Sequence, residues 1–252
     1  MSIIFESIVA VGAVSLVSLV GLAALSLRQE FLQRALFLLI SLAAGALLGD
    51  AFIHLLPEAF EEAGNPLLVS LFVLAGILTF FVLEKFLHWH HSHGDDEFSP
   101  DHARIHPIGN LVLVSDGVHN LVDGIAIGAA FMVSPEIGIA TAVAIALHEI
   151  PQEIGDFGLL VHAGYSRTKA LFFNFLSALT AFVGLGLAFW FSSAIDGVTP
   201  LITAFAAGNF IHIACTDLVP ELYKTKDAKR SFLQFAVIVA GIAAMVALLG
   251  VE

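Results

Sequence analysis

The sequence predicts an all-α fold, a polytopic membrane bundle of about eight transmembrane helices. Apolar residues make up 58% of the 252 residues, charged residues only 13%, and the mean hydropathy is +0.94. A soluble domain carries roughly 25% charged residues, and one soluble core of this length could not bury so much apolar surface. No basic stripe indicates nucleic-acid binding, and the single Cys215 excludes an intrachain disulfide framework.

Eight apolar segments are each close to the ~20 residues that a transmembrane helix needs. They cover roughly residues 5–27, 33–57, 67–88, 105–132, 137–163, 168–193, 199–222 and 231–250. The first segment has no basic leader and is long enough to span, so we expect no cleavable signal peptide. We expect the segments to form a single transmembrane transporter domain, residues 1–252.

All ten basic residues lie in alternate loops between the predicted spans. These are Arg28 and Arg34, then Lys85 and Arg104, then Arg167 and Lys169, then Lys224, Lys226, Lys229 and Arg230. Since Lys and Arg concentrate in cytoplasmic loops, both termini are predicted to lie outside. The regular alternation also supports the count of eight. We expect a multi-pass protein of the cytoplasmic (plasma) membrane.

A short internal repeat relates the second and seventh segments. His54 lies three residues before Pro57-Glu58, and Asp217 lies three residues before Pro220-Glu221. The two segments are predicted to run in opposite directions, and inverted repeats with Pro-interrupted helices are typical of transporters. The sequence therefore predicts an inverted repeat that relates helices 1–3 to helices 6–8.

The fourth and fifth segments carry polar groups near their centres. The fourth has Asp116, His119, Asn120 and Asp123, and the fifth has His148, Glu149, Gln152, Glu153 and Asp156. His119 and Asp123 share a helix face, as do His148 and Gln152, and Glu149 and Glu153. Since a charge at this depth costs about 2.5–3.5 kcal/mol, the two helices need a shared partner, and a divalent cation fits. Mixed nitrogen and oxygen ligands favour zinc, iron, manganese or cadmium over calcium and magnesium.

The cargo route follows from the remaining polar residues. Pro151 frees the carbonyl of Leu147, and such irregular backbone is tolerated where it lines a cavity. Acidic groups at the outer mouth, Glu58, Glu61 and Glu62, would attract the metal, and Asp116 and Asp156 would lie on its way to the cytoplasm. His54 and Asp217 fit either this pathway or a structural role. We expect an interfacial or capping role for Asp50 and Glu58, and helix packing or helix ends for His162 and His212.

A His-rich stretch covers about residues 88–104, within a predicted cytoplasmic loop. It includes His90, His91 and His93. This composition is typical of weak, flexible metal binding, and the alternative is a solvated linker.

These motifs resemble the ZIP (zinc–iron permease) family. His119-Asn120-Leu-Val-Asp123-Gly124 and His148-Glu149-Ile-Pro151-Gln152-Glu153 look like its paired signature, and the stretches around His54 and Asp217 are also similar to it. The resemblance implies uptake of zinc or a related metal into the cytoplasm through a binuclear site between helices 4 and 5. Positions that match the family's ligands are His119, Asn120, Asp123, His148, Glu149 and Gln152, with Asn174 adding a contact.

The family branch closest in this motif has a second His where this chain has Gln152, which softens the expected zinc selectivity. We include Glu153 among the predicted ligands because it shares a face with Glu149. The predicted partners are metal ions, the lipid bilayer and a second copy of the chain, with no nucleic acid and no organic cofactor.

Two other functions are compatible with the sequence. His148-Glu149-Ile-Pro151-Gln152 nearly matches the His-Glu-x-x-His zinc protease motif, but Gln152 replaces the second His and Pro151 interrupts the helix. We therefore expect no enzyme activity. The other alternative is a metal sensor without flux, in which the loop histidines act alone. Sequence does not separate a carrier from a slow selective channel.

Overall fold

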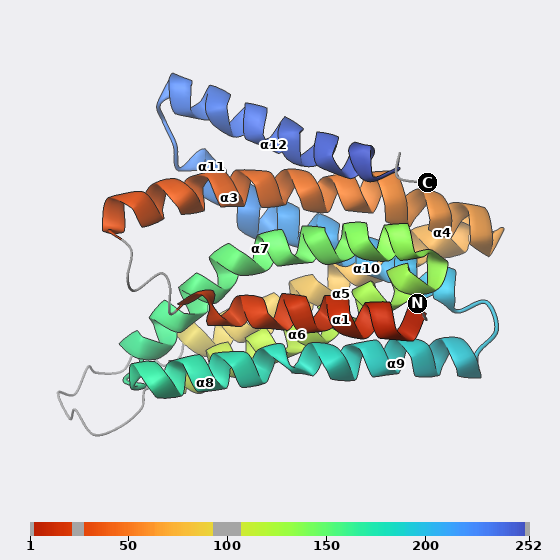
Figure 1. Cartoon of the computed structure of the whole chain (residues 1–252), viewed down its shortest axis with the longest axis horizontal. Coiled ribbons are helices and arrows are strands. Elements are labelled where there is room, and N and C mark those ends of the chain that lie inside the picture. Colours follow the sequence, from red (N-terminus) through yellow and green to blue (C-terminus); the bar gives the residue numbers. More distant parts are fainter. Residues whose placement is uncertain (1–2, 22–27, 93–106, 250–252) are drawn as a thin grey trace.

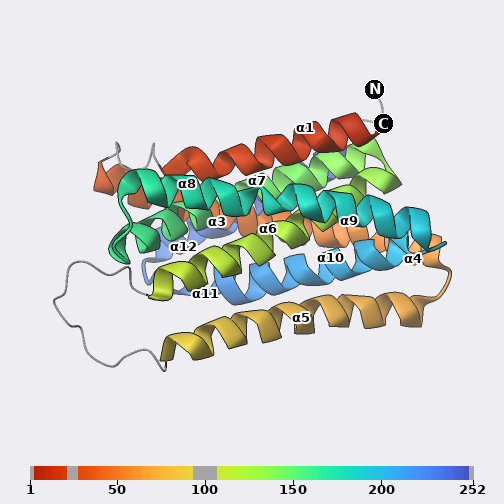
Figure 2. The same cartoon turned by 90° about the horizontal axis from the view of Figure 1, so that it is seen from below.

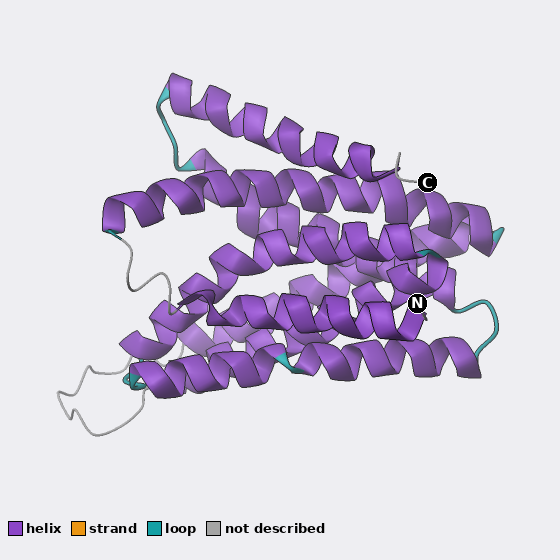
Figure 3. Ribbon diagram, in the orientation of Figure 1, coloured by secondary structure: helices purple, strands orange, loops and turns teal. Residues whose placement is uncertain are grey.

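The computed structural model describes residues 3–21, 28–92 and 107–249. Within these ranges helices are the only regular secondary structure (Figure 3). They group into eight rods that run roughly along the long axis of the molecule (Figure 1).

Each rod corresponds to one predicted span, and four of the rods are interrupted or joined from shorter pieces. The rods are, in order, α1 (Ile3–Ser15) with the 3₁₀ turn η1 (Leu16–Leu19); α3 (Gln29–Gly49) with η2 (Asp50–Leu55) and α4 (Leu56–Ala63); α5 (Pro66–Ser92); α6 (Pro107–Val133); α7 (Pro135–His162); α8 (Arg167–Ala178) with α9 (Thr180–Ala194); α10 (Thr199–Ile213) with η3 (Ala214–Leu218) and α11 (Val219–Tyr223); and α12 (Ala228–Leu248).

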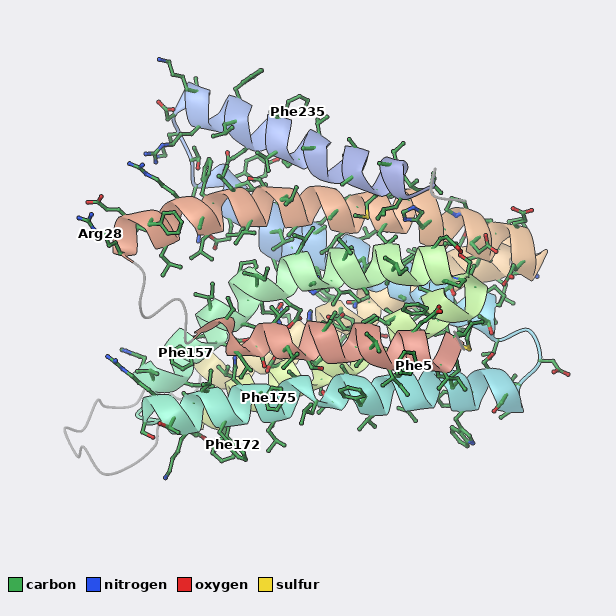
Figure 4. The ribbon with its side chains drawn as sticks, viewed as in Figure 1. Phe5, Arg28, Phe157, Phe172, Phe175 and Phe235 are labelled. Carbon is green, nitrogen blue, oxygen red and sulfur yellow. The ribbon has the colours of Figure 1, made fainter. Side chains whose placement is uncertain are left out.

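Five described helical stretches are long and apolar enough to cross a membrane: Glu30–Ala63, Pro66–Leu83, Arg167–Ala194, Thr199–Tyr223 and Ala228–Leu248. α6 and α7 are not among them because their polar central turns lower their mean hydropathy. Large apolar side chains such as Phe172 and Phe235 point away from the bundle and are exposed (Figure 4). Such a surface suits lipid, so the prediction of a polytopic membrane bundle is confirmed.

Capping residues in the described loops explain where several rods begin and end. The Ser134 hydroxyl accepts a hydrogen bond from the backbone N–H of Ile137 at the start of α7, and Asp227 accepts one from Arg230 at the start of α12. These side chains satisfy donors that a helix N-terminus leaves unpaired. α4 ends at Gly64, whose positive φ of 61° suits glycine.

The two ends of the bundle differ in charge. Both chain termini lie at one end, which we call the terminal end, and Arg28 lies at the opposite end (Figures 1 and 4). The described loops that carry Lys and Arg connect rods at this second end, which we call the basic end. The basic end is predicted to face the cytoplasm because of its charge.

A shared interruption supports the predicted repeat. η2 and η3 are both π-helical, and each directly precedes a short α-helix with proline in its first turn. His54, Pro57 and Glu58 correspond to Asp217, Pro220 and Glu221 at a constant offset of 163 positions (54 to 217, 57 to 220). Since proline lacks an N–H and clashes with the carbonyl four residues back, a widened turn before it relieves both problems.

The second and eighth rods pack through glycines, as do the third and seventh. A Cβ on Gly45 would lie 2.1 Å from the Ile238 carbonyl oxygen, and one on Gly241 would lie 2.5 Å from that of Leu42. In the same way, a Cβ on Gly208 of α10 would collide with the Val73 carbonyl oxygen of α5, and one on Gly76 of α5 would collide with the Phe205 carbonyl oxygen of α10. Figure 2 shows α5 alongside α10. Gly45 and Gly208 are also 163 positions apart, so the repeat extends to the helix contacts.

Two glycines on α9 provide a test of this packing. A Cβ on buried Gly184 would lie 1.9 Å from the Leu121 carbonyl oxygen of α6, whereas Gly186 has nothing within 4 Å. We expect Gly184→Ala to destabilise the protein by about 1–3 kcal/mol, because overpacking forces the helices apart. Gly186→Ala is expected to be neutral or slightly stabilising, since alanine is the better helix former. Thermal unfolding in detergent measures both, and equal midpoints for the two variants would contradict the close approach.

Candidate metal centre

Four predicted ligands from α6 and α7 meet in the interior of the bundle. The Nε2 atom of His119 lies 3.1 Å from His148 Nε2, 3.6 Å from Asp123 Oδ2 and 3.3 Å from Glu149 Oε1. His148 Nε2 lies 3.4 Å from Asp123 Oδ2 and 3.5 Å from Glu149 Oε1. The four side chains are buried or nearly so. We call this group the His-carboxylate cluster.

The spacing of these atoms fits a four-coordinate ion. The five distances above are five edges of a tetrahedron whose corners are two nitrogens and two oxygens. In a regular tetrahedron with edges of roughly 3.3 Å, the centre lies about 2.0 Å from each corner, which is the length of a zinc bond to His nitrogen or carboxylate oxygen. The cluster is thus arranged to hold an ion of this size without large side-chain movement.

A second group of buried carboxylates shares one member with the first. Asp116, Glu149 and Glu153 each offer an oxygen within 4.8 Å of the others. The Ser177 hydroxyl and the Asn120 amide nitrogen donate to Asp116, and the Asn174 amide nitrogen donates to Glu153. Glu149 therefore lies between an imidazole-rich group and an oxygen-only group.

Buried polar atoms without a hydrogen-bond partner gather at this place. Among the described residues they are Asn120 Oδ1, both carboxylate oxygens of Asp123, Glu149 Oε1, Glu153 Oε1 and Asn174 Oδ1, with Asn209 as the remaining case. A buried acceptor left unpaired is costly, and a carboxylate much more so. All but those of Asn209 belong to predicted ligands, so the residues fit a bound cation well.

A cavity of about 600 Å³ leads from the cluster. His119, His148, Pro151, Gln152 and Asp156 line one side of it. Except for His148 at the midpoint of α7, its lining residues belong to the halves of their rods that are nearer the basic end, out to Glu221 on α11. The site is thus reached from the basic end, and α7 changes direction along its length near this region (Figure 1).

The family assignment rests on comparisons with known proteins. The profile of the ZIP zinc transporter family matches residues 2–107 and 88–249, nearly the whole chain. The chain belongs to the ZIP family.

Curated ZIP relatives share about a third of its residues. Zinc transporter ZIP13 of Pongo abelii is 35% identical over 222 residues, which are 82% of this chain and 65% of the relative. Zinc transporter YKE4 of Saccharomyces cerevisiae is 30% identical over 241 residues, 83% of this chain and 70% of the relative. The metal cation symporter ZIP14 of Xenopus tropicalis is 31% identical over an alignment 305 positions long, gaps included. The chain covers only 39% of zinc transporter ZIP4 of Rattus norvegicus.

Most of the predicted ZIP ligands come together in the structure. His119, Asp123, His148 and Glu149 form the His-carboxylate cluster, and Asn120, Glu153 and Asn174 surround the second group. Gln152 lines the cavity beside them, as do Asp156 and Asp217. Asp116, which we expected along the exit, lines the same cavity and also belongs to the second group.

The expectation for Asp50 was wrong. Asp50 is fully buried rather than interfacial, because its carboxylate accepts hydrogen bonds from the Thr141 hydroxyl at 2.8 Å and from His54 Nδ1 at 2.9 Å. His54 and Glu58, with Glu136, line a separate cavity of about 170 Å³ near the terminal end. His212, which we expected at a packing position or helix end, is buried against Phe80 in the last turn of α10 and also lines the large cavity.

Sequence reasoning missed Ser177 and Thr141, which bind Asp116 and Asp50 from other rods. Both hydroxyls are hard to recognise because Ser and Thr are common in membrane helices, where they pair with their own backbone. The predicted loop site lies mostly outside the described residues. His93 belongs to the range 93–106, and His90 and His91 lie in the last turns of α5.

A metal-binding measurement tests this ZIP centre. Zinc should raise the thermal midpoint of the purified protein, and excess chelator should reverse the effect, because a ligand that binds only the folded state adds about 2.7 kcal/mol at 100 times its Kd. Asp123→Ala should lose most of this stabilisation. Asp196→Ala, at an exposed loop position of the terminal end, should keep it. A full zinc shift in Asp123→Ala would contradict the assignment.

Proposed function

We propose that this chain transports a divalent transition metal, with zinc as the first candidate, through an intramembrane site between α6 and α7. The tetrahedral arrangement of His119, Asp123, His148 and Glu149, buried and with unpaired carboxylate oxygens, carries this proposal. Membership of the ZIP family and the names of its relatives support it.

The cargo site is proposed to be binuclear. One ion would bind the His-carboxylate cluster, and a second would bind Asp116, Glu149 and Glu153, with Asn120, Asn174 and Gln152 as additional ligands. Glu149 contributes to both groups, so its carboxylate would bridge the two ions. A shared carboxylate offsets part of the repulsion between two divalent charges at short range.

The metal is proposed to move into the cytoplasm across the plasma membrane. His54 and Glu58 line the small cavity near the terminal end, where the acidic residues Glu61, Glu62 and Glu136 also lie. Their charge would concentrate cations at the entry. From the cluster, the large cavity leads past Asp156 to the basic end. Receipt of the metal by the loop histidines, and assembly as a homodimer, remain predictions.

Flux measurement tests the transport proposal. We expect purified wild-type protein in liposomes to take up zinc-65, and His119→Ala/His148→Ala to reduce the flux to that of empty liposomes. An exchange of Asp196 for Ala, away from both cavities, serves as the matched control. If wild-type protein binds zinc but gives no flux, the sensor alternative gains support, and zinc-dependent cleavage of casein would support the enzyme alternative.

Metal preference offers a further prediction, centred on Gln152. It follows His148 by one helical turn and lines the same cavity. An amide oxygen is a harder ligand than imidazole. Imidazole therefore suits zinc better than it suits manganese. We expect Gln152→His to raise the ratio of zinc uptake to manganese uptake by several-fold, and Gln152→Glu not to raise it. Competition between zinc-65 and unlabelled manganese measures the ratio, and an unchanged ratio in Gln152→His would show that position 152 does not bind the cargo.

A further inference from the structure

A groove with a volume of about 490 Å³ lies between α3 and α12, in the halves of these helices that are nearer the basic end. The two helices touch in their middle turns, where Gly45 approaches Ile238 and Gly241 approaches Leu42. From there they diverge toward the basic end (Figure 1). The residues that line the groove are exposed or partly exposed, so it opens on the outside of the bundle. We call it the α3–α12 groove.

The lining of the α3–α12 groove changes from polar to apolar along the two helices. The turns nearest the basic end contribute two guanidinium groups, a carboxylate and an amide, from Glu30, Gln33, Arg34 and Arg230. The next turn of each helix contributes only apolar side chains, which we call the apolar floor: Phe37, Leu38 and Leu233. A groove that is cationic at its mouth and apolar beyond it matches the two parts of a phospholipid, an anionic phosphate and its acyl chains.

The length of the second rod places the mouth of this groove at the level of the lipid headgroups. At about 1.5 Å per residue, α3, η2 and α4 together are roughly 50 Å long, whereas the hydrocarbon core of a bilayer is about 30 Å thick. The ends of the rod therefore extend into the headgroup regions, and Arg34 lies in the second turn from the basic end. That end is predicted to face the cytoplasm, where the membrane surface is negatively charged.

The charge of the groove is available to a ligand. In the described part of the chain, no hydrogen bond or ion pair joins the guanidinium of Arg34 or Arg230 to another residue, whereas Lys224 at the same end pairs with Glu221. Two arginines and the carboxylate of Glu30 give the lining a net charge of +1 (two minus one). One phosphodiester, which carries a single negative charge, would neutralise it.

Contacts with the seventh rod hold the beginning of α12 in place beside the groove. Asp227 caps α12 by accepting a hydrogen bond from the backbone N–H of Arg230. Gln234, buried one turn later, donates hydrogen bonds of 3.3 Å to the Leu222 carbonyl oxygen and to the Thr225 hydroxyl. Because these contacts tie α12 to the end of α11, the separation of α12 from α3 is part of the fold.

We propose that the α3–α12 groove binds one anionic phospholipid of the adjoining leaflet. Arg34 and Arg230 would hold its phosphodiester, Glu30 would accept a hydrogen bond from a headgroup hydroxyl, and an acyl chain would lie along the apolar floor. Guanidinium groups suit phosphate because they donate two hydrogen bonds at once. Basic pockets between transmembrane helices on the cytoplasmic side bind lipid headgroups in the same way.

Native mass spectrometry of the full-length protein in detergent, which counts bound lipids, tests the site. We expect wild-type protein to bind one phosphatidylglycerol more tightly than phosphatidylcholine, whose headgroup is cationic and has no hydroxyl. Arg34→Gln/Arg230→Gln should weaken phosphatidylglycerol binding about 25-fold, since each basic side chain near an anionic lipid contributes about fivefold. Both side chains are exposed, so the fold should tolerate the change. Equal affinity of the wild type for the two lipids would overturn the proposal.

The double variant Arg28→Gln/Lys229→Gln provides the matched control. It also removes two positive charges from the beginnings of α3 and α12, but neither residue lines the groove. It should leave the affinity for phosphatidylglycerol near that of the wild type. Equal losses in the two double variants would show a general attraction of anionic lipid to the basic end, and no specific site.

Two further measurements separate a phospholipid from a soluble phosphate. Leu38→Ser/Leu233→Ser, at two exposed positions of the apolar floor, should weaken phosphatidylglycerol binding, because the acyl chain loses apolar contact. Glycerol phosphate, which carries the phosphate without acyl chains, should not displace the lipid at millimolar concentration. Displacement by glycerol phosphate, or unchanged lipid binding in Leu38→Ser/Leu233→Ser, would assign the groove to a soluble anion and overturn the proposal.

Discussion

Buried charge without a protein partner is the constraint to which the rest of the bundle conforms. α6 and α7 carry five carboxyl groups and two imidazoles in the region of the metal centre, and such groups cannot face lipid without a large cost. The two helices therefore lie inside, with α1, α3, α9 and α10 packed around them. α5 and α12 lie on the outside, since only 17% of the residues in the apolar stretch of each helix are buried. A cation between α6 and α7 would balance the negative charge of these carboxylates, which the surrounding helices do not neutralise.

Helical periodicity accounts for how much of the centre could be foreseen. Ligands on one helix follow from i,i+4 spacing, so His119 with Asp123 and the polar row beginning at His148 were evident from the sequence. The pairing of α6 with α7 followed from charge, because both helices carry central charged groups that need a partner away from lipid. Ser177 and Thr141 could not be recognised, since their role depends on which rod lies beside them.

Regular and irregular backbone serve different purposes in this fold. Where rods pack tightly, as at Gly45 and Gly208, the helices are regular and the missing side chain lets carbonyl groups approach closely. Where a rod borders a cavity, its hydrogen bonding changes: η2 holds His54 and η3 holds Asp217. Widened turns expose backbone groups, and membrane proteins tolerate these only where a cavity or neighbouring protein can satisfy them. The two π-turns thus lie beside the two cavities.

The repeat that joins the second and seventh rods also bears on how the chain enters a membrane. Two copies of one three-helix unit stand in opposite orientations, so the unit itself has no preferred direction. Charge supplies that preference separately in each copy. Arg28 and Arg34 lie at the start of the second rod, while only Asp196 lies between the sixth and seventh rods. The end of the second rod is acidic, and four basic residues lie between the end of α11 and the first turn of α12. Exchanging the charges between equivalent loops would therefore oppose the orientation that the contacts between the halves require, such as those of Gly45 with Ile238 and of Gly208 with Val73.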